Sequence, residues 1–470
     1  MNIKVEKIIL RKNKMKILFV IKMLDYGDYL SVGYLSSVAK DLGHETSLCI
    51  LDDDDIFNKV EDFKPDILAY SANILGFEDM VKVNKILLKK YKYISIMGGP
   101  QVTFCPELFK NSSMDVFCVG EGEIPFKEFL QKVDNGESFD DILNLITKNK
   151  VNEIRPLIED LDSLPSPDRD LTIRNTILKD VSKKSFFTSR GCPFSCSYCC
   201  NNYYKKLYKG KGKIVRRFSV DSIIYEMKKV KEVYNMDFVR IGDDIFAIKA
   251  DDWLRDFASK YKKEINLPFN CYLRLDLVND NLLKILKEAG CYSVHLSIDS
   301  CSKKVREEVL NRKWKDVNVE EKLMMIHSYG IKTWVNFMVA APLSTVDDDL
   351  DAIRLGKKAK ISYLSFTTTT PVPNTELYNY CVENNLIDKN FQGHTGLLRT
   401  KSLLNCFSER DKQVRQNILC LGAIAAKMPS PLYHFFIFLI KRVPSNRFFY
   451  KIYTRYLNYV HKKIIFKLKY

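Results

Sequence analysis

Residues 188–202, TSRGCPFSCSYCCNN, contain four of the chain's 13 cysteines. Cys192, Cys196 and Cys199 follow the spacing C-x3-C-x2-C, and Cys200 departs from it. Three thiolates on one short loop can each bind one iron of a cubane iron–sulfur cluster, which leaves the fourth iron open to an external ligand. The spacing therefore predicts an iron–sulfur cluster at Cys192, Cys196 and Cys199, with Cys200 as a bystander.

A disulfide knot and a zinc site are the alternatives for these cysteines. Disulfides belong to oxidising compartments, and an odd number of unevenly spread cysteines is typical of reduced thiols in the cytoplasm. Structural zinc takes four ligands, commonly from two C-x2-C pairs. No second pair occurs, because Cys271, Cys291 and Cys301 are isolated. The residues favour iron and sulfide, and they leave both alternatives open.

The elements that must position this loop follow from the hydrophobic pattern of residues 184–400. Strand-like runs such as FVRIGDD and SVHLSIDS alternate there with helical runs such as SVDSIIYEMKKVKEVY. About six strand–helix units predict a partial or full (β/α) parallel barrel, whose active site lies at the carboxyl ends of its strands. The cysteine loop follows the first strand and so belongs to that end.

Residues 14–135 show a second alternation of strands and helices, from KMKILFVI to DVFCVGEGEIPFKEFLQKV. This pattern predicts an open, doubly wound parallel sheet, which binds ligands beyond the carboxyl ends of its strands. Residues 136–183 are mixed and polar and include SLPSPD, so we expect a linker there. The fold class is therefore α/β, with a doubly wound sheet, a barrel and a helical, basic region at 401–470.

The cysteine spacing, with an aromatic Tyr198 before the third cysteine, resembles the radical S-adenosylmethionine superfamily over the whole barrel. The resemblance implies a [4Fe–4S] cluster on Cys192, Cys196 and Cys199, with S-adenosylmethionine bound to the open iron. Electron transfer from the reduced cluster would then cleave the sulfonium and give a 5′-deoxyadenosyl radical.

Other stretches resemble the family at later strand ends. IGDDIF, YLRLD and SIDS stand where family members bind S-adenosylmethionine, although DD replaces the usual Gly-Gly-Glu and Asp299 stands where Glu is usual. The resemblance implies that these side chains contact S-adenosylmethionine: Tyr198, Asp243, Asp244, Arg274, Ser297 and Asp299. A helix N-cap at Asp243 or Asp244, and a surface ion pair at Arg274, are the structural alternatives.

The N-terminal sheet resembles the cobalamin-binding domains that precede such barrels. GGPQVTFCPE, GEGEIPF and YSANI carry this resemblance. It implies cobalamin contacts at Ser71, Gly98, Gly99, Gly120, Glu121 and Gly122. The D-x-H-x-x-G signature, whose histidine ligates cobalt, is absent, so we expect no histidine ligand from it. A domain that kept the fold and lost the cofactor is the alternative.

Together these resemblances imply a cobalamin-dependent radical S-adenosylmethionine enzyme that methylates an unactivated carbon. One S-adenosylmethionine would methylate cobalamin, and a second would give the radical that activates the substrate. A radical cyclisation, rearrangement or oxidation with the same cofactors is one alternative, and a non-catalytic iron–sulfur or corrin-binding partner protein is another. The substrate is an organic molecule of unknown class, and the electron would come from an external reductant such as a flavodoxin or ferredoxin.

The net charge of +16 is concentrated near the end of the chain, where residues 412–470 contain 12 Lys or Arg and no Asp or Glu. No apolar run reaches the roughly 20 residues that a membrane span requires, so we expect a cytoplasmic protein. Aromatic and basic residues interleave in this tail. They favour packing on the barrel first, then contact with the inner membrane surface, and RNA binding last, so nucleic acid is not an expected partner.

Overall fold

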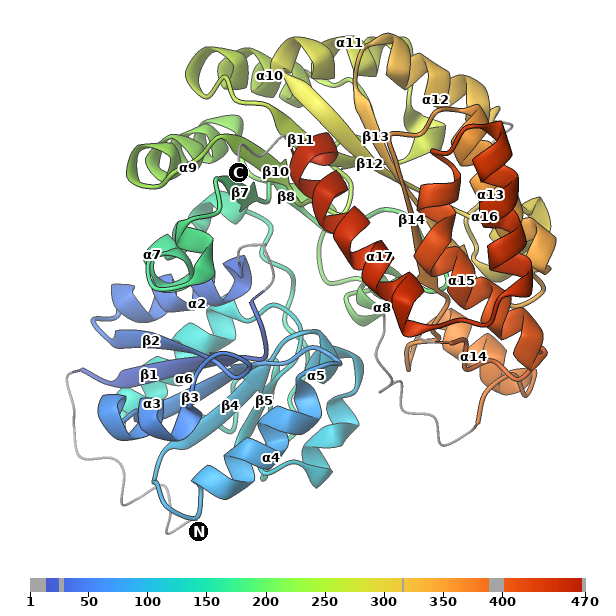
Figure 1. Ribbon diagram of the computed structural model, residues 1–470. Helices are drawn as coiled ribbons and strands as arrows, with labels where there is room; N and C mark the ends of the chain where they lie inside the picture. Colours follow the sequence, from blue (N-terminus) through green and yellow to red (C-terminus); the bar gives the residue numbers. More distant parts are fainter. Residues whose placement is uncertain (1–13, 25–28, 315–316, 389–400, 467–470) are drawn as a thin grey trace. The chain divides into compact units, whose positions relative to one another are not determined.

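The computed structural model describes residues 14–24, 29–314, 317–388 and 401–466 (Figure 1). The chain forms two compact units. The first contains the residues up to Val181 together with Tyr203–Arg216, and the second contains Ser182–Asn202 and the residues from Arg217 onward.

A six-stranded sheet organises the first unit, in the order β2-β1-β3-β4-β5-β6 (Figure 1). The strands are β1 (Lys16–Ile21), β2 (Glu45–Ile50), β3 (Ile67–Ser71), β4 (Ile94–Gly98), β5 (Val116–Cys118) and β6 (Leu145–Thr147). All neighbours are parallel except β5 and β6. The order 2-1-3-4-5 is a common doubly wound arrangement, which confirms the predicted sheet and places a ligand site at the carboxyl ends of its strands.

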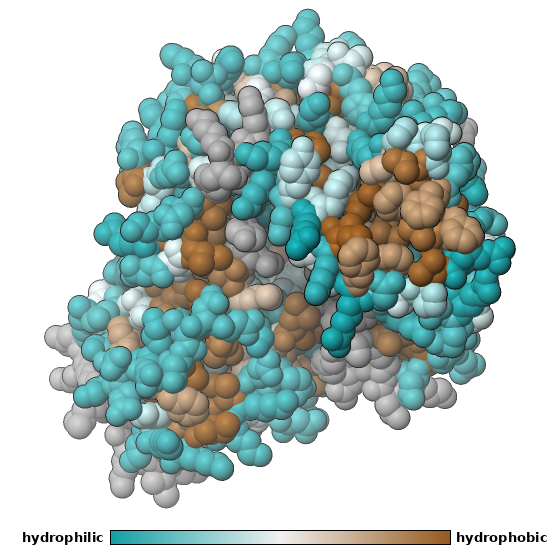
Figure 2. Space-filling model, in the orientation of Figure 1, coloured by the Kyte–Doolittle hydropathy of each residue, from teal (hydrophilic) through white to brown (hydrophobic). Residues whose placement is uncertain are grey.

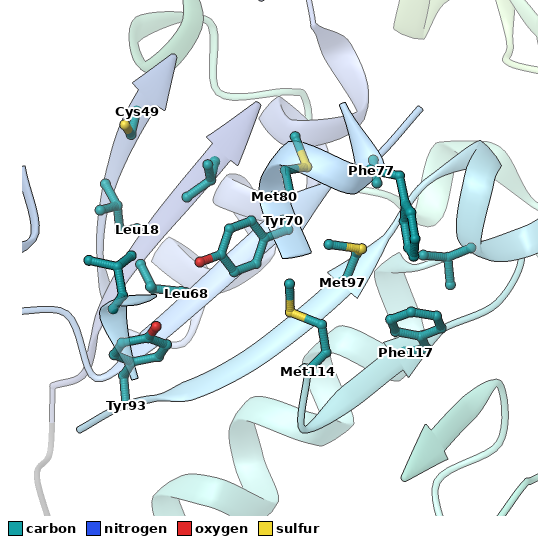
Figure 3. Packing of buried hydrophobic residues seen from close by; sticks show 14 of the residues in the cluster. Leu18, Cys49, Leu68, Tyr70, Phe77, Met80, Tyr93, Met97, Met114 and Phe117 are labelled. Atoms are coloured by element: carbon teal, nitrogen blue, oxygen red, sulfur yellow. The ribbon is translucent and has the colours of Figure 1, made fainter. Parts of the chain in front are cut away.

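Helices connect these strands, as the alternating pattern predicts. They are α2 (Leu30–Asp41), α3 (Ile56–Phe63), α4 (Phe77–Leu87), α5 (Pro100–Phe104), η1 (Pro106–Asn111) and α6 (Glu123–Asn135). Figure 3 shows one side of the core, where Leu18, Leu68, Met97 and Phe117 from four parallel strands pack with Met80 of α4. All five side chains are buried, because strands of a parallel sheet are covered on both faces.

The residues predicted as a linker, 136–183, lie almost entirely within the first unit. They contribute β6 and the short helical elements η2 (Leu161–Ser163), α7 (Arg169–Ile173) and η3 (Ile177–Lys179). Asp168 accepts a hydrogen bond from Ser36 of α2 at 2.6 Å and pairs with Lys40 at 2.6 Å. The segment shows no clear hydrophobic period because its elements are three to five residues long.

The second unit contains a sheet of six parallel strands in the order β14-β13-β12-β11-β10-β7. The strands are β7 (Lys183–Phe186), β10 (Phe238–Ile241), β11 (Phe269–Leu273), β12 (Cys291–Asp299), β13 (Lys332–Val339) and β14 (Tyr363–Thr368). Sequential order with parallel pairing throughout is that of a (β/α) barrel. Strands β7 and β14 form the two edges, so of the two predicted forms the barrel is the partial one.

The connections of this barrel are mostly helical (Figure 1). They are α8 (Cys200–Leu207), α9 (Val220–Val233), α10 (Asp252–Glu264), η4 (Leu275–Leu277), α11 (Asp280–Ala289), η5 (Val305–Val309), α12 (Val319–Ser328), α13 (Val346–Lys358) and α14 (Glu376–Glu383), with the short strands β8 (Ser189–Arg190) and β9 (Arg216–Arg217). Residues 203–207 of α8 belong to the first unit.

The basic tail belongs to the second unit. It forms α15 (Glu409–Ala425), α16 (Ser430–Arg442), α17 (Arg447–Tyr459) and the π-helical turn η6 (Val460–Ile465). Helix α15 packs against α13 and β14, and it is buried on most sides. Arg415 of α15 pairs with the buried Asp349 of α13 at 2.6 Å. The first of the three interpretations of the tail, packing on the barrel, therefore describes α15, and the predicted boundary at residue 400 lies outside the described residues.

Candidate active site

A cavity of about 490 Å³ lies in the second unit, bordered by strand ends of the barrel and by the cysteine loop. Seven of the residues predicted from the sequence line it: Cys192, Cys196, Tyr198, Cys199, Asp244, Arg274 and Ser297. A cavity of this size falls within the range of about 300–1,000 Å³ that is common for sites of small molecules and cofactors. The fold thus brings the thiols and most of the predicted S-adenosylmethionine contacts to one place.

The cysteine loop is held by hydrogen bonds to the last residue of η5 and to the residues that follow it. Ser197 donates from its hydroxyl to Val309 O at 2.6 Å and from its amide to Leu310 O at 3.0 Å. Asn311 donates to Ser195 O at 2.7 Å. These contacts fix the backbone around the second and third cysteines before any cofactor binds.

Burial raises the pKa of both Cys192 and Cys196, and the neighbouring Cys199 thiol adds to the rise in each. Burial raises the pKa of Cys192 to about 11. Hydrogen bonding from the Cys200 thiol lowers the pKa of Cys199 to about 7, and Asn201 adds to this effect. Cys200, which does not line the cavity, therefore stabilises the thiolate form of Cys199 by a hydrogen bond. The cysteine spacing alone did not indicate this contact.

The donor set fits an iron–sulfur cubane and does not fit a single metal ion. Within the described residues, no three Cys, His, Asp or Glu side chains converge on one point that could hold an ion. A structural zinc ion requires four converging ligands, whereas a cubane binds each thiolate to a different iron. All 13 cysteines are free thiols, so the disulfide alternative has no support.

Arg312 is a functional candidate that sequence reasoning missed. This cavity-lining residue pairs with Asp299 through Nε and Oδ2 at 2.9 Å and donates from Nη2 to Ser297 O at 2.6 Å. Its Nη1 lies 3.4 Å from Tyr198 Oη and 3.7 Å from Cys196 Sγ. Arg312 therefore places a buried positive charge beside one cluster ligand. Its segment, NRKWKD, has no periodic signal that would have identified it.

Asp299 and Asp243 lie behind the cavity wall, and each is only 1% exposed. Asp299 is paired with Arg312 and accepts hydrogen bonds from Tyr198 at 2.6 Å and from Ser297. Asp299 is therefore buried among protein groups, with all of these partners on the second unit.

Asp243 has a comparable set of partners. It accepts from the amide and hydroxyl of Thr188 and from the amide and hydroxyl of Ser189, at 2.5–3.2 Å. Burial raises the pKa of Asp243 to about 6, although these four donors oppose the rise. Asp243 therefore stabilises the backbone at the start of the cysteine loop. Asp244 is exposed and lines the cavity, so it is the acidic side chain that faces the cavity at this strand end.

Arg274 lines the cavity but is already engaged with protein groups. It forms two hydrogen bonds with Asp276, at 2.8 and 2.9 Å, and its guanidinium lies 3.7 Å from the centroid of the Phe194 ring. Arg274 is 7% exposed, so the ion pair is a buried one and not the surface pair considered from the sequence. A ligand carboxylate would share this cation with Asp276.

The residues predicted to contact cobalamin lie at neighbouring strand ends of the first unit. Ser71, the last residue of β3, is the register partner of Gly98, the last residue of β4. Gly120 and Gly122 follow β5, and all of these positions are half-buried. Small residues at three adjacent carboxyl ends leave backbone surface accessible, which fits the broad face of a corrin.

Two of these glycines also have a reason within the protein. A Cβ on Gly99 would lie 2.6 Å from Ala72 O, and one on Gly120 would lie 1.9 Å from Tyr208 Oη. Both glycines have positive φ angles of 100° and 84°. They are therefore required by the turn and by close packing whether or not a cofactor binds.

Glu121 has an assigned role in the first unit. Its carboxylate pairs with Arg216, at 2.9 and 3.1 Å, and accepts from Ile158 N at 3.1 Å. Arg216 is 7% exposed, so this is a largely buried pair that joins residues 121, 158 and 216. The Glu121 side chain thus supports the loop after β5, and its backbone is what remains for a cofactor. The D-x-H-x-x-G signature was sought in the stretch that begins at Asp25, and Asp25 lies outside the described residues.

Comparison with known proteins identifies both units. The protein-family model for the radical SAM superfamily matches residues 186–356 of the sequence. The protein-family model for the B12 binding domain matches residues 19–130. An uncharacterized methyltransferase of Pyrococcus horikoshii is 28% identical over 437 residues, which cover 88% of this chain and 92% of that protein. Cytidylyl-2-hydroxyethylphosphonate methyltransferase of Streptomyces wedmorensis is 22% identical over 417 residues, which cover 77% and 75%.

Among solved structures, the radical S-adenosylmethionine methyltransferase TsrM from Kitasatospora setae, with cobalamin and a [4Fe–4S] cluster bound, shares the fold. The TM-score is 0.67 at 15% identity, and the match covers 79% of this chain and 78% of that one. On this chain the B12 binding domain precedes the radical SAM domain, and three thiols lie at one cavity of the barrel. The chain therefore belongs to the cobalamin-dependent radical S-adenosylmethionine enzymes, whose cofactors are a [4Fe–4S] cluster, S-adenosylmethionine and cobalamin.

Proposed function

We propose that this enzyme transfers a methyl group from S-adenosylmethionine to an unactivated carbon of an organic substrate. The observation that carries the proposal is the trio of thiols at a cavity of a barrel that shares its chain with a B12 binding domain. When bound, the cluster would supply the electron that cleaves S-adenosylmethionine, and cobalamin would carry the methyl group.

Residues of the cavity have separate roles in this proposal. Cys192, Cys196 and Cys199 hold the cluster, and Asp244 and Arg274 lie where they can contact the amino and carboxylate groups of S-adenosylmethionine. Tyr198 and Ser297 line the cavity and donate hydrogen bonds to Asp299. These hydrogen bonds fix the orientation of both side chains in the cavity wall. In the first unit, we assign the corrin contacts to Ser71, Gly98, Gly99, Gly120, Gly122 and the Glu121 backbone.

Product analysis tests methyl transfer. The protein is purified anaerobically with iron, sulfide and hydroxocobalamin, then given a reductant, S-adenosylmethionine with a deuterated methyl group and a small-molecule extract of the source cells. We expect S-adenosylhomocysteine and 5′-deoxyadenosine in equal amounts, with deuterium in a new product. The Cys196→Ser variant is the control, and it should form no 5′-deoxyadenosine because the cluster ligand is lost.

The alternatives predict other product patterns. A cyclisation, rearrangement or oxidation gives 5′-deoxyadenosine without S-adenosylhomocysteine, and that result would exclude methylation. A non-catalytic cofactor-binding partner forms neither product. Deuterium recovered in the tRNA fraction would indicate an RNA substrate instead of a small molecule.

The electron donor is proposed to be a small reductase protein such as a flavodoxin or ferredoxin. Each methyl transfer would consume two electrons, one to cleave S-adenosylmethionine and one to return cobalamin to the form that accepts the next methyl group, so an external donor must supply them. If the rate of turnover with reduced flavodoxin is close to the rate with dithionite, this donor is supported. If the enzyme turns over with dithionite but not with reduced flavodoxin, the result argues against it.

We further propose a peripheral contact with an anionic membrane surface through α16 and α17. Leu432, Phe435 and Phe438 are 48–56% exposed on one face of α16, where Figure 2 shows hydrophobic side chains gathered. Exposed cations flank this face, among them Lys441 and Arg442. Aromatic side chains beside a basic surface suit the interface of an anionic bilayer. No helix in the described part of the chain has the length and apolar character of a membrane span.

Cosedimentation with vesicles tests this contact. We expect the protein to bind vesicles of phosphatidylglycerol, to bind pure phosphatidylcholine much less, and to be released by salt because the attraction is partly electrostatic. The double variant Phe435→Ser/Phe438→Ser should bind at least about tenfold more weakly, since each buried aromatic ring contributes more than 1 kcal/mol. Tyr225→Ser, at an exposed site on α9, is the matched control. Equal binding by all three proteins would contradict the proposal.

A further inference from the structure

Four rings form a continuous layer across neighbouring strands of the barrel, at the cavity that the cysteine loop also lines. Tyr272, His295, Trp334 and Tyr363 are register partners on the adjacent strands β11, β12, β13 and β14. The centroids of successive rings are 4.6, 4.1 and 5.6 Å apart, and the His295 and Trp334 rings are stacked at 8°. All four rings line the cavity. We call this layer the ring wall.

The tail completes the ring wall from another part of the chain. Tyr453 and Leu457 of α17 and His461 of η6 line the same cavity. The His461 ring lies 4.7 Å from that of Trp334 and 5.4 Å from that of Tyr363. Ser293 of β12 donates to Ile465 O at 2.8 Å, which fixes η6 against the barrel. The shape of the cavity beside the ring wall therefore depends on the tail.

The charge of the ring wall disfavours a cationic ligand. Arg240 donates to Tyr272 Oη at 2.5 Å, and its guanidinium lies 5.6 Å from the centroid of that ring. Burial lowers the pKa of His295 to about 3, so its imidazole is neutral, and the charge of Arg240 acts in the same direction. A half-buried cation beside neutral rings raises the local potential, so a neutral or anionic group binds here more readily than a cation.

Polar atoms border the rings on the side of the strand ends. Trp334 donates from Nε1 to Ser365 Oγ at 2.9 Å, and Ser365 donates to Asn336 Oδ1 at 3.0 Å. In the part of the chain that the structure describes, His295 Nδ1 is buried and has no hydrogen-bond partner. Buried nitrogen atoms normally have a partner. This nitrogen could therefore bond to a polar substituent of a ligand.

Ordinary packing of a barrel interior does not explain the arrangement. Barrel interiors are filled by layers of mainly branched aliphatic side chains that pack without a void. This layer consists instead of aromatic and imidazole rings that border a cavity of about 490 Å³. Ring faces bind other flat rings by stacking, with an added contribution of about 0.5–1.5 kcal/mol for each ring pair.

We propose that the ring wall is the substrate subsite and binds a flat, conjugated, uncharged ring that bears one hydrogen-bonding group. This inference rests on the proposed function, since it names the class of substrate that the radical chemistry would reach. The tail, through Tyr453 and His461, determines the depth of the subsite and thereby the size of ring that fits.

Binding of a matched pair of probes tests the proposal. The reconstituted full-length enzyme is titrated calorimetrically under anaerobic conditions with 2-naphthol and with decahydro-2-naphthol, which has the same carbon skeleton and hydroxyl group but no conjugation. We expect 2-naphthol to bind at least about tenfold more tightly, as stacking on two rings would give. Trp334→Leu and His461→Leu should each weaken 2-naphthol binding by about tenfold, whereas Trp334→Phe should retain most of it.

Tyr459→Leu is the matched control, because Tyr459 lies on the same helix as Tyr453 but is 59% exposed. It should bind 2-naphthol like the parent protein. Cluster absorbance and thermal unfolding of each variant show whether the fold is intact, and the milder His461→Leu decides the outcome if Trp334→Leu fails to fold. Equal affinity for the two probes, or unchanged binding in His461→Leu, would overturn the ring wall as a ring subsite.

The two proposals fail in different ways. If 2-naphthol does not bind but S-adenosylhomocysteine and 5′-deoxyadenosine form in equal amounts from cell extract, methyl transfer stands and the ring subsite is wrong. If 2-naphthol binds as expected and S-adenosylhomocysteine never forms, the ring subsite stands and methyl transfer is wrong.

Discussion

Replacing Cys192, Cys196 or Cys199 by serine will abolish the [4Fe–4S] cluster and with it all formation of 5′-deoxyadenosine. Each thiolate is expected to bind a different iron, and a hydroxyl group, which stays protonated near neutral pH, is a much poorer ligand than a thiolate. Iron and sulfide content, together with the visible absorbance of anaerobically reconstituted protein, measures the loss.

Cys200→Ser is the matched control for these variants, since Cys200 neighbours Cys199 but lies outside the cavity lining. Its thiol supports the Cys199 thiolate by a hydrogen bond. A serine hydroxyl can donate in the same way, so we expect Cys200→Ser to keep the cluster. Loss of the cluster in Cys200→Ser, or its retention in Cys196→Ser, would contradict the assignment of ligands.

Arg312→Leu is expected to lower the free energy of unfolding by about 3–5 kcal/mol, because it leaves Asp299 as an unpaired buried charge. Asp299 is 1% exposed and Arg312 is 6% exposed, so water cannot replace the lost partner. Removing the cation 3.7 Å from Cys196 Sγ should also lower the reduction potential of the cluster, since a nearby positive charge favours the added electron.

Chemical denaturation and an anaerobic redox titration measure these two effects. Arg354→Leu is the control, because Arg354 is paired on the surface of α13 and surface pairs contribute at most about 1 kcal/mol. Adding Asp299→Asn to Arg312→Leu should restore part of the stability and part of the potential, because it also removes a negative charge that acts on Cys196. An unchanged potential in Arg312→Leu would show that this side chain is structural only.

The sequence was sufficient for features that depend on local spacing. The C-x3-C-x2-C loop, the two alternations of strand and helix and the glycines after β4 and β5 all involve residues within about 20 positions of one another. Hydrophobic period and ligand spacing are local properties, so both sheets and the cluster site could be predicted before any contact was known. Resemblance to a family then supplied the cofactors, which the comparisons support.

The sequence could not show which of several similar residues faces the cavity. Only the tertiary structure distinguished them. Asp243 and Asp244 are neighbours of the same type, yet one is buried under four donors and the other lines the cavity. A strand end turns successive side chains in different directions, and the sequence contains no information that distinguishes them. Likewise, only the tertiary structure showed that residues 136–181 of the expected linker group with the first unit and that the tail groups with the second.

The sequence by itself therefore determined the fold class and predicted three cysteines as cluster ligands, because both follow from short-range pattern. Only the tertiary structure showed that Arg312 lies beside Cys196 and that His461 meets Trp334, across separations of 116 and 127 residues in the chain. Such contacts arise when parallel strands and the helices that follow them bring distant segments to one cavity. The physical reason is that packing, and not sequence distance, decides which side chains share a site.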